Sequence, residues 1–153
     1  MLDRDHDISV LNSLTTTTID SAHGFEQSAD DAKGGRFETL FREFAAERRE
    51  VVAMLQESVR AMGGTPDDDG SFKADLHRRW LDLRAALTGG GGDKAVIEEV
   101  ERGEDYIKAK FEKALESEDL GTEARQVVER AYQSVRAGHD QISQLKHGME
   151  SNA

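Results

Sequence analysis

The sequence predicts an all-α protein, a four-helix bundle with a short fifth helix in the middle of the chain. Apolar residues recur at steps of three and four along the long segments, which is the period of an amphipathic helix. Glycines separate these segments, and the single proline, Pro66, leaves long helices uninterrupted. No alternation typical of a β-strand continues for more than a few residues. The length of 153 residues fits one domain.

The boundaries of the predicted helices follow from this periodicity and from the glycines. The helices are expected at about 7–32, 36–62, 72–87, 93–117 and 122–146. Together they form one domain over residues 7–146. The ends, 1–6 and 147–153, are expected to be flexible.

Stop and cap signals support three of these boundaries. Gly63-Gly64-Thr65-Pro66 places glycines at a helix C-cap and a proline just beyond it. Asp93 and Thr122 are the residue types that cap helix N-termini, and we expect them to cap the last two long helices.

The lengths of the connections predict the topology. The links within the first pair and within the last pair of long helices are short, so each pair should form an antiparallel hairpin. The stretch from 63 to 93 lies between the hairpins, carries the short helix and is long enough to run the length of the bundle. Two hairpins joined by one long crossover form the ferritin-like arrangement. Trp80 is expected to pack the crossover helix onto the bundle.

Composition narrows the classes of function. The net charge of −11 repels phosphate backbones, which argues against nucleic-acid binding. The absence of cysteine excludes disulfides and thiolate metal sites. No apolar run approaches the roughly 20 residues that span a bilayer, so no membrane association is expected. Residues 1–7 do not resemble a signal peptide, and a cytoplasmic location is expected.

Each apolar stripe has a gap where an ionisable residue takes a core-facing step. These residues are Glu26, Glu47, Glu104 and His139, one on each long helix, with His23 one turn before the first. A buried carboxylate without a partner destabilises a fold, so four such groups predict a shared counter-ion. Carboxylate oxygens with an imidazole suit iron, manganese or zinc. The alternatives are a buried hydrogen bond between Glu104 and His139, and a salt bridge from Glu47 to a nearby arginine.

Several motifs also resemble one known family. They are Gly-Phe-Glu at 24–26, Gly-Gly-Thr-Pro at 63–66, the stretch from His77 to Thr88, Glu101-Arg-Gly-Glu104-Asp105 and Ala137-Gly-His139-Asp140. Together they are similar to a bacterial family of ferritin-like four-helix-bundle proteins of unknown function, related to rubrerythrin-like proteins. The resemblance covers about residues 8–146. It implies the ferritin-like fold and a link to stress responses.

The candidate metal site departs from a complete di-iron centre. Such a centre takes a Glu from each of two helices and Glu-x-x-His from each of the other two. Here the second helix has Glu50 where the histidine belongs, and the last has Arg136 where the glutamate belongs. Glu50 joins the candidate ligands, and Arg136 could itself take the place of a cation. One metal, a degenerate pair and an ionic network without metal all remain open.

Three functions follow from these observations. The first is a ferritin-like metal-binding protein, with oxidase or peroxide-detoxifying chemistry supplied by bound iron. The second is a metal-free structural or interaction module that self-associates as a homodimer or higher oligomer, for which the weak apolar stripe of the first helix leaves a face. The third is a small-ligand carrier. We rank it last, because no wide run of small core residues opens a cavity.

Overall fold

The computed structural model describes residues 4–70, 74–89 and 91–151, and this part of the chain contains helices and no strand. The five helices are α1 (Arg4–Asp31), α2 (Glu38–Ala61), α3 (Ala74–Thr88), α4 (Gly92–Glu116) and α5 (Thr122–Ser151). Four long helices and one shorter helix in the middle confirm the all-α class that the apolar periodicity predicted.

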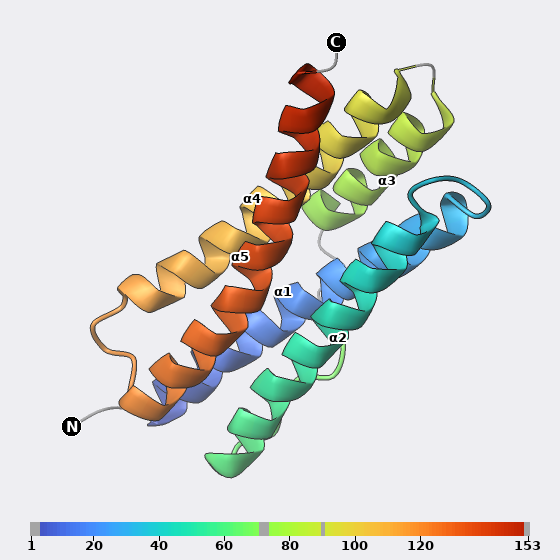
Figure 1. Ribbon diagram of the computed structural model, residues 1–153. Helices are drawn as coiled ribbons and strands as arrows, with labels where there is room; N and C mark the ends of the chain where they lie inside the picture. Colours follow the sequence, from blue (N-terminus) through green and yellow to red (C-terminus); the bar gives the residue numbers. More distant parts are fainter. Residues whose placement is uncertain (1–3, 71–73, 90, 152–153) are drawn as a thin grey trace.

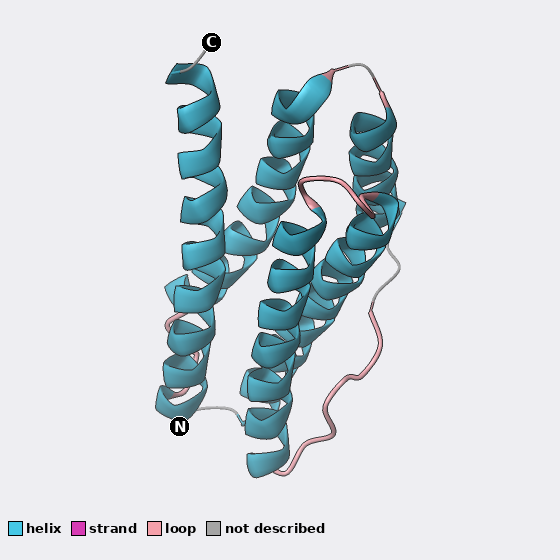
Figure 2. Cartoon of the chain, turned by 45° about the vertical axis from the view of Figure 1, so that its right-hand side comes forward, coloured by secondary structure: helices cyan, strands magenta, loops and turns pink. Residues whose placement is uncertain are grey.

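The helices form two antiparallel hairpins, α1 with α2 and α4 with α5 (Figure 1). The chain leaves α2 through a loop that runs back along the bundle toward α3 (Figure 2). α1 also packs against α4, and α2 against α5, so that α2 and α4 lie diagonally opposite each other. α3 packs on α4 and α1 and covers that side of the bundle. The two predicted hairpins and the crossover between them are therefore present.

Glycine ends both helices of the first hairpin. Gly34 follows α1 with a φ of 80°, and Gly63 follows α2 with a φ of 84°, in the left-handed region that other residues rarely adopt. After α2, the Gly63 amide donates to the carbonyl of Arg60 and the Gly64 amide to that of Val59. This is the Schellman pattern of hydrogen bonds, and it confirms the predicted stop at Gly63 and Gly64.

The start of α4 differs from the prediction. The helix begins at Gly92, and its N-cap residue is Gly91, which makes no side-chain cap bond. The prediction that Asp93 caps this helix is therefore wrong. Asp93 instead forms an ion pair with Arg36 from the turn between α1 and α2. Its carboxylate connects the two hairpins at this end of the bundle.

The first and last helices are longer than predicted. α1 begins at Arg4 rather than near residue 7, and α5 continues to Ser151 rather than ending near residue 146. Residues 1–3 and 152–153, which belong to the ends predicted to be flexible, lie outside the described residues.

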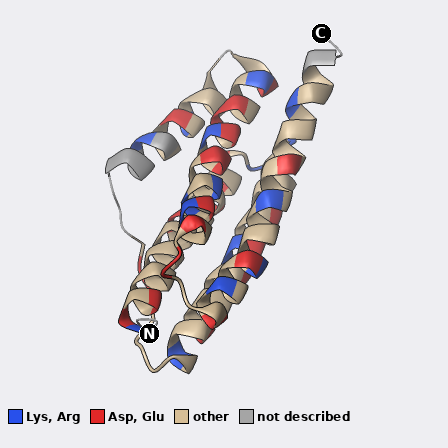
Figure 3. Ribbon diagram, turned by 90° about the vertical axis from the view of Figure 1, so that its left-hand side faces the viewer, with Lys and Arg blue, Asp and Glu red and all other residues tan. Residues whose placement is uncertain are grey.

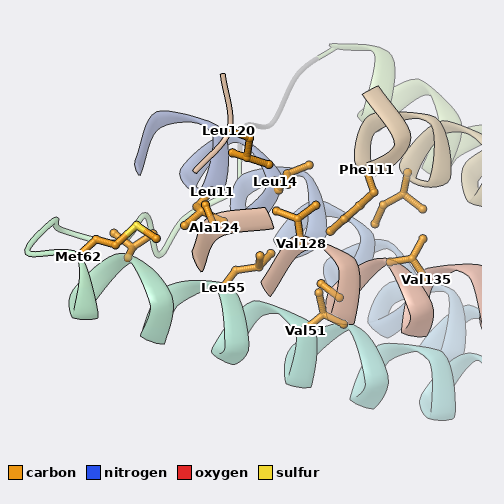
Figure 4. Packing of buried hydrophobic residues seen from close by; sticks show 13 residues of the cluster. Leu11, Leu14, Val51, Leu55, Met62, Phe111, Leu120, Ala124, Val128 and Val135 are labelled. Atoms are coloured by element: carbon orange, nitrogen blue, oxygen red, sulfur yellow. The ribbon is translucent and has the colours of Figure 1, made fainter. Parts of the chain in front are cut away.

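The hydrophobic core consists of two clusters, one toward each end of the bundle. The Leu55 cluster contains Leu11, Leu14, Val51, Leu55, Val59, Met62, Ile107, Phe111, Leu120, Ala124, Val128, Ala131 and Val135 (Figure 4). The Phe41 cluster contains Phe25, Ala29, Ala32, Phe37, Phe41, Phe44, Ala45, Val96, Ile97, Val100 and Ile142. The middle of each long helix lies between these two clusters. The bundle thus has a central layer that belongs to neither.

The start of α1 is attached to the turn before α5. The Asp7 side chain is buried, and its Oδ1 accepts a hydrogen bond of 3.0 Å from the Gly121 amide. A Cβ at Gly121 would lie 2.4 Å from Asp7 Oδ2, so this contact requires glycine. The carboxylate also lies at the positive end of the α5 dipole. Thr122, the predicted cap, is the first residue of α5, and a carboxylate from α1 serves its N-terminus.

We expect Asp7→Ala to lower the free energy of unfolding by about 1–2 kcal/mol, because it leaves the Gly121 amide without its buried acceptor. Chemical denaturation measures this change. Asp5→Ala is the matched control, since it removes an exposed carboxylate from the same turn of α1, and it should cost less than about 0.5 kcal/mol. Equal stability of the two variants would contradict the role of Asp7.

Charged residues of both signs follow one another along the helices (Figure 3). Acidic residues outnumber basic ones, which gives the net charge of −11. Among the helices that the structure describes, none combines the length and the apolar character needed to cross a bilayer.

Candidate functional site

An arginine–glutamate pair occupies the central layer between the two hydrophobic clusters. Arg48 of α2 donates from Nη1 to Glu104 Oε2 at 2.9 Å and from Nη2 to Glu104 Oε1 at 2.6 Å. The two side chains are 0% and 1% exposed. One guanidinium therefore engages both oxygens of the carboxylate, which is a strong and geometrically specific arrangement. The pair joins the diagonally opposite helices α2 and α4 through the centre of the bundle.

Aromatic rings and a hydroxyl group complete the surroundings of Arg48. Its Cζ lies 5.8 Å from the ring centre of Phe25 and 5.9 Å from that of Phe44, within cation–π range. Nη1 also donates to Ser21 Oγ at 3.2 Å. Nε has no hydrogen-bond partner among the described residues. The carboxylate, the hydroxyl and the rings together offset the cost of burying this cation.

Gly138 of α5 makes room for the pair. A Cβ at this position would lie 2.8 Å from Arg48 Nη2 and 3.0 Å from both Glu104 Oε1 and Phe44 Cε1. The backbone of α5 therefore approaches the charged groups as closely as a helix can. Any side chain larger than hydrogen would displace atoms that are fully buried.

Glu104 has a different partner from the two that the sequence suggested. Arg136 is 64% exposed and lies 3.9 Å from Asp140 on its own helix, so it is not the central cation. His139 Nε2 lies 2.6 Å from Asp105 Oδ1. The buried cation is Arg48, a residue that sequence reasoning did not single out.

Glu26 and His23, the candidate ligands on α1, lie near the surface. Arg49 donates to Glu26 from Nη2 at 2.8 Å and from Nε at 3.2 Å. These hydrogen bonds lower the pKa of the Glu26 carboxyl below its ordinary value, against a smaller opposing effect of burial. His23 Nδ1 lies 3.6 Å from Glu26 Oε1. Glu26 is thus part of a half-exposed ionic group with Arg49, separate from the central pair.

Glu47 and Glu50 on α2 are exposed. Partial desolvation raises the pKa of the Glu47 carboxyl; the cation of Arg48 opposes this shift, and the carboxylates of Glu50 and Glu104 add to it. The charges of the central pair therefore influence the pKa of Glu47, but the Glu47 side chain is not part of that pair.

The six candidate ligands do not gather around one point. They are Glu26, Glu47, Glu104, His139, His23 and Glu50, and only Glu104 is buried. Among the side chains that the structure describes, no three His, Asp or Glu residues are placed to hold one metal ion. At the centre, both Glu104 oxygens already engage a guanidinium. The donor set there fits an internal ion pair and does not fit a metal ion.

A pocket that the sequence did not predict lies between α1, α3 and α4. Its volume is about 340 Å³, which is within the range of small-molecule sites. Phe25, Trp80 and Ile107 contribute aromatic and apolar walls, and Glu104 lines it from the centre of the bundle. Small residues open the space: Thr17, Ser21, Gly24 and Ser28 of α1, and Gly103 of α4.

A signal for this pocket is present in the sequence of α1. The small residues Thr17, Ser21, Gly24 and Ser28 recur at steps of four, three and four, so they share one face of the helix. Sequence reasoning noticed only that the apolar stripe of this helix was weak, and it assigned the weak face to self-association. The rest of the pocket lining comes from α3 and α4. The spacing of residues along α1 does not show which helices face it.

Two comparisons with known proteins bear on this site. A family model described as a domain of unknown function (DUF2383) matches residues 6–117. A comparison with curated proteins gives no match. The matched region extends from α1 through α4, so it contains the ion pair and all three helices of the pocket. Because the match covers more than half of the sequence, the chain belongs to the DUF2383 family.

Proposed function

We propose that this protein is a ferritin-related helical binding module that receives a small, largely apolar ligand in the pocket between α1, α3 and α4. The pocket itself carries this proposal. Its volume of about 340 Å³ would hold a compact organic molecule, and its walls include the rings of Phe25 and Trp80. Sites of this size with mostly apolar walls and a few polar groups are typical of small-molecule binding.

The glycines in the walls support an open space rather than close helix packing. A Cβ added at Gly24 or at Gly103 would meet no atom within 4 Å. Gly138 is the opposite case, because there the same Cβ would clash with the ion pair. Glycine inside a helix costs about 1 kcal/mol relative to alanine. Glycine at these two positions therefore makes the helices less stable than alanine would, without allowing closer packing. This is expected if the open space is needed for a ligand.

The ferritin-like arrangement and the relation to rubrerythrin-like proteins are part of this proposal. The two hairpins and their long crossover support them. Ferritin-like di-iron proteins hold their metal on inward-facing side chains of all four helices. In this bundle, Arg48 and Glu104 lie in the central layer between the two hydrophobic clusters. We propose that the guanidinium of Arg48 takes the place of the metal as the central positive charge.

Titration with phenylbutanol, a neutral aromatic probe, tests the pocket. Trp80 is the only tryptophan and lines the pocket, so its fluorescence should change on binding. Gly103→Leu fills the space and should weaken binding at least about tenfold. Gly148→Leu is the matched control, because its Cβ also meets no atom within 4 Å but it does not line the pocket. This control should bind like the unaltered protein.

Both substitutions replace a helical glycine with a better helix former, so neither should unfold the bundle. Thermal unfolding followed by circular dichroism checks this point. The proposal fails if phenylbutanol leaves Trp80 fluorescence unchanged and shows no heat of binding by calorimetry. It also fails if Gly103→Leu and Gly148→Leu bind the probe equally well.

Metal binding, with iron, manganese or zinc, stays a prediction of the sequence, although the central donor set favours it less. Elemental analysis of protein purified without chelator, before and after incubation with each metal, measures it. Because Glu104 already pairs with Arg48, we expect well under one metal per chain. Close to one metal per chain, lost in Glu104→Gln, would favour the metal-binding function instead.

A further inference from the structure

We infer that the pocket between α1, α3 and α4 selects an organic ammonium, that is, a ligand with an apolar body and a cationic head that donates hydrogen bonds. This inference rests on the proposed function and names the ligand class of the same pocket. Three features of the lining support it: its carboxylates, the orientation of its hydroxyl groups and its aromatic rings.

Carboxylates supply the only charged groups of the pocket lining in the described residues. Asp20, Glu99 and Glu104 line the space, and none of its described lining residues is a lysine or an arginine. Glu104 is balanced by Arg48, and Glu99 pairs with Arg102, whose side chain is 64% exposed. Three carboxylates thus line the pocket, and the cations that pair with two of them, Arg48 and Arg102, are not among its described lining residues. This charge pattern favours a cation over an anion.

A neighbouring recess extends the same charge pattern. It shares Glu99 and Tyr106 with the pocket and adds Asp82, Asp105 and Arg102. The recess beside the pocket is therefore lined by more acidic than basic side chains. Because the whole chain is also acidic, its field attracts cations and disfavours anions that approach it.

Two hydroxyl groups in the wall, those of Thr17 and Ser28, offer acceptors to the pocket. Thr17 Oγ1 donates its proton to the carbonyl of Ser13 at 3.1 Å, and Ser28 Oγ donates to that of Gly24 at 2.7 Å. A hydroxyl has one proton and two lone pairs, so these oxygens offer the pocket only acceptor positions. Donors in the lining are the amide of Gln27 and the ring of His23, which lie on its exposed parts, and the indole of Trp80. A ligand head with several N–H donors matches these acceptors.

The aromatic rings of the lining are suited to the same head. Ring faces attract ammonium and guanidinium groups. The chain itself uses two of these rings in this way: Arg84 lies 5.9 Å from the centre of the Trp80 ring, and Lys110 Nζ lies 5.4 Å from that of Tyr106. Aromatic faces next to carboxylates form a common recognition pattern for organic cations.

A matched series of three probes tests this selectivity. Phenylbutylammonium, phenylbutanol and phenylbutyrate share one apolar body and carry a positive, neutral or negative head. Calorimetry and Trp80 fluorescence give their affinities. We expect the ammonium to bind about tenfold more tightly than the alcohol, and the carboxylate to bind most weakly. Glu99→Gln should remove most of the preference for the ammonium. Glu98→Gln removes the same charge from α4 outside the pocket lining and should retain the preference.

The outcomes separate this inference from the proposed function. Equal affinities for all three probes, or tightest binding of phenylbutyrate, would overturn the charge selectivity and leave the pocket intact as a binding site. No binding of any probe would overturn both. If Glu99→Gln does not fold, salt dependence decides on the unaltered protein: added salt should weaken the ammonium and leave the alcohol unchanged. An ammonium affinity independent of salt would count against the inference.

Discussion

Replacing Glu104 with alanine is expected to lower the free energy of unfolding by about 3–5 kcal/mol, because it leaves the buried guanidinium of Arg48 without its counter-charge. Chemical denaturation measures this loss. Glu26→Ala is the matched control, since it removes a carboxylate from the half-exposed pair with Arg49 and should cost at most about 1 kcal/mol.

The double variant Arg48→Met with Glu104→Leu separates the cost of an unpaired buried charge from the cost of lost packing. It removes both buried charges and keeps similar volumes, so we expect it to be more stable than Glu104→Ala. The double-mutant cycle through Arg48→Met and Glu104→Leu should show strong coupling between the two positions. Additive losses, or a Glu104→Ala variant as stable as Glu26→Ala, would show that the ion pair is not what holds the centre together.

Replacing Gly138 with alanine should have the second largest effect, a loss of about 1–3 kcal/mol. In most helical positions this change stabilises, because alanine is the better helix former by about 1 kcal/mol. Here the new Cβ would lie 2.8 Å from Arg48 Nη2 and 3.0 Å from Glu104 Oε1. Both atoms are fully buried and hydrogen-bonded, so they cannot move aside without straining the pair.

Gly148→Ala provides the control for Gly138→Ala on the same helix. The added Cβ there would meet no atom within 4 Å, so only the gain in helix propensity should remain. The two substitutions should therefore change the free energy of unfolding in opposite directions in chemical denaturation. The same sign and size for both would mean that α5 does not approach the ion pair as closely as the structure shows.

The helices and the chain path could be predicted from the sequence, because glycines and connection lengths set them locally. The identity of the central charges could not. In α2, both Glu47 and Arg48 fit the gap between Phe44 and Val51, one at steps of three and four, the other at four and three. Periodicity does not separate such neighbours. The structure buries Arg48 and exposes Glu47.

The same ambiguity recurs on two other helices. On α1 the gap admits Phe25 or Glu26, and on α5 it admits Gly138 or His139. Choosing the ionisable residue each time predicted a shared metal site. The structure instead buries Phe25 and Gly138, which pack around a single ion pair. Only on α4 did the ionisable choice, Glu104, coincide with the buried residue.

The diagonal position of the ion pair has a consequence for how the two halves of the molecule come together. Each hairpin can form from contacts close in sequence, while the side chains of Arg48 on one and Glu104 on the other remain hydrated. When the two hairpins pack together, both charged groups must be desolvated in the same step. If one hairpin were shifted along the other by one helical turn, about 5.4 Å, both charges would be buried among apolar residues without a partner. The ion pair thus favours the one alignment of the two hairpins in which both buried charges are paired.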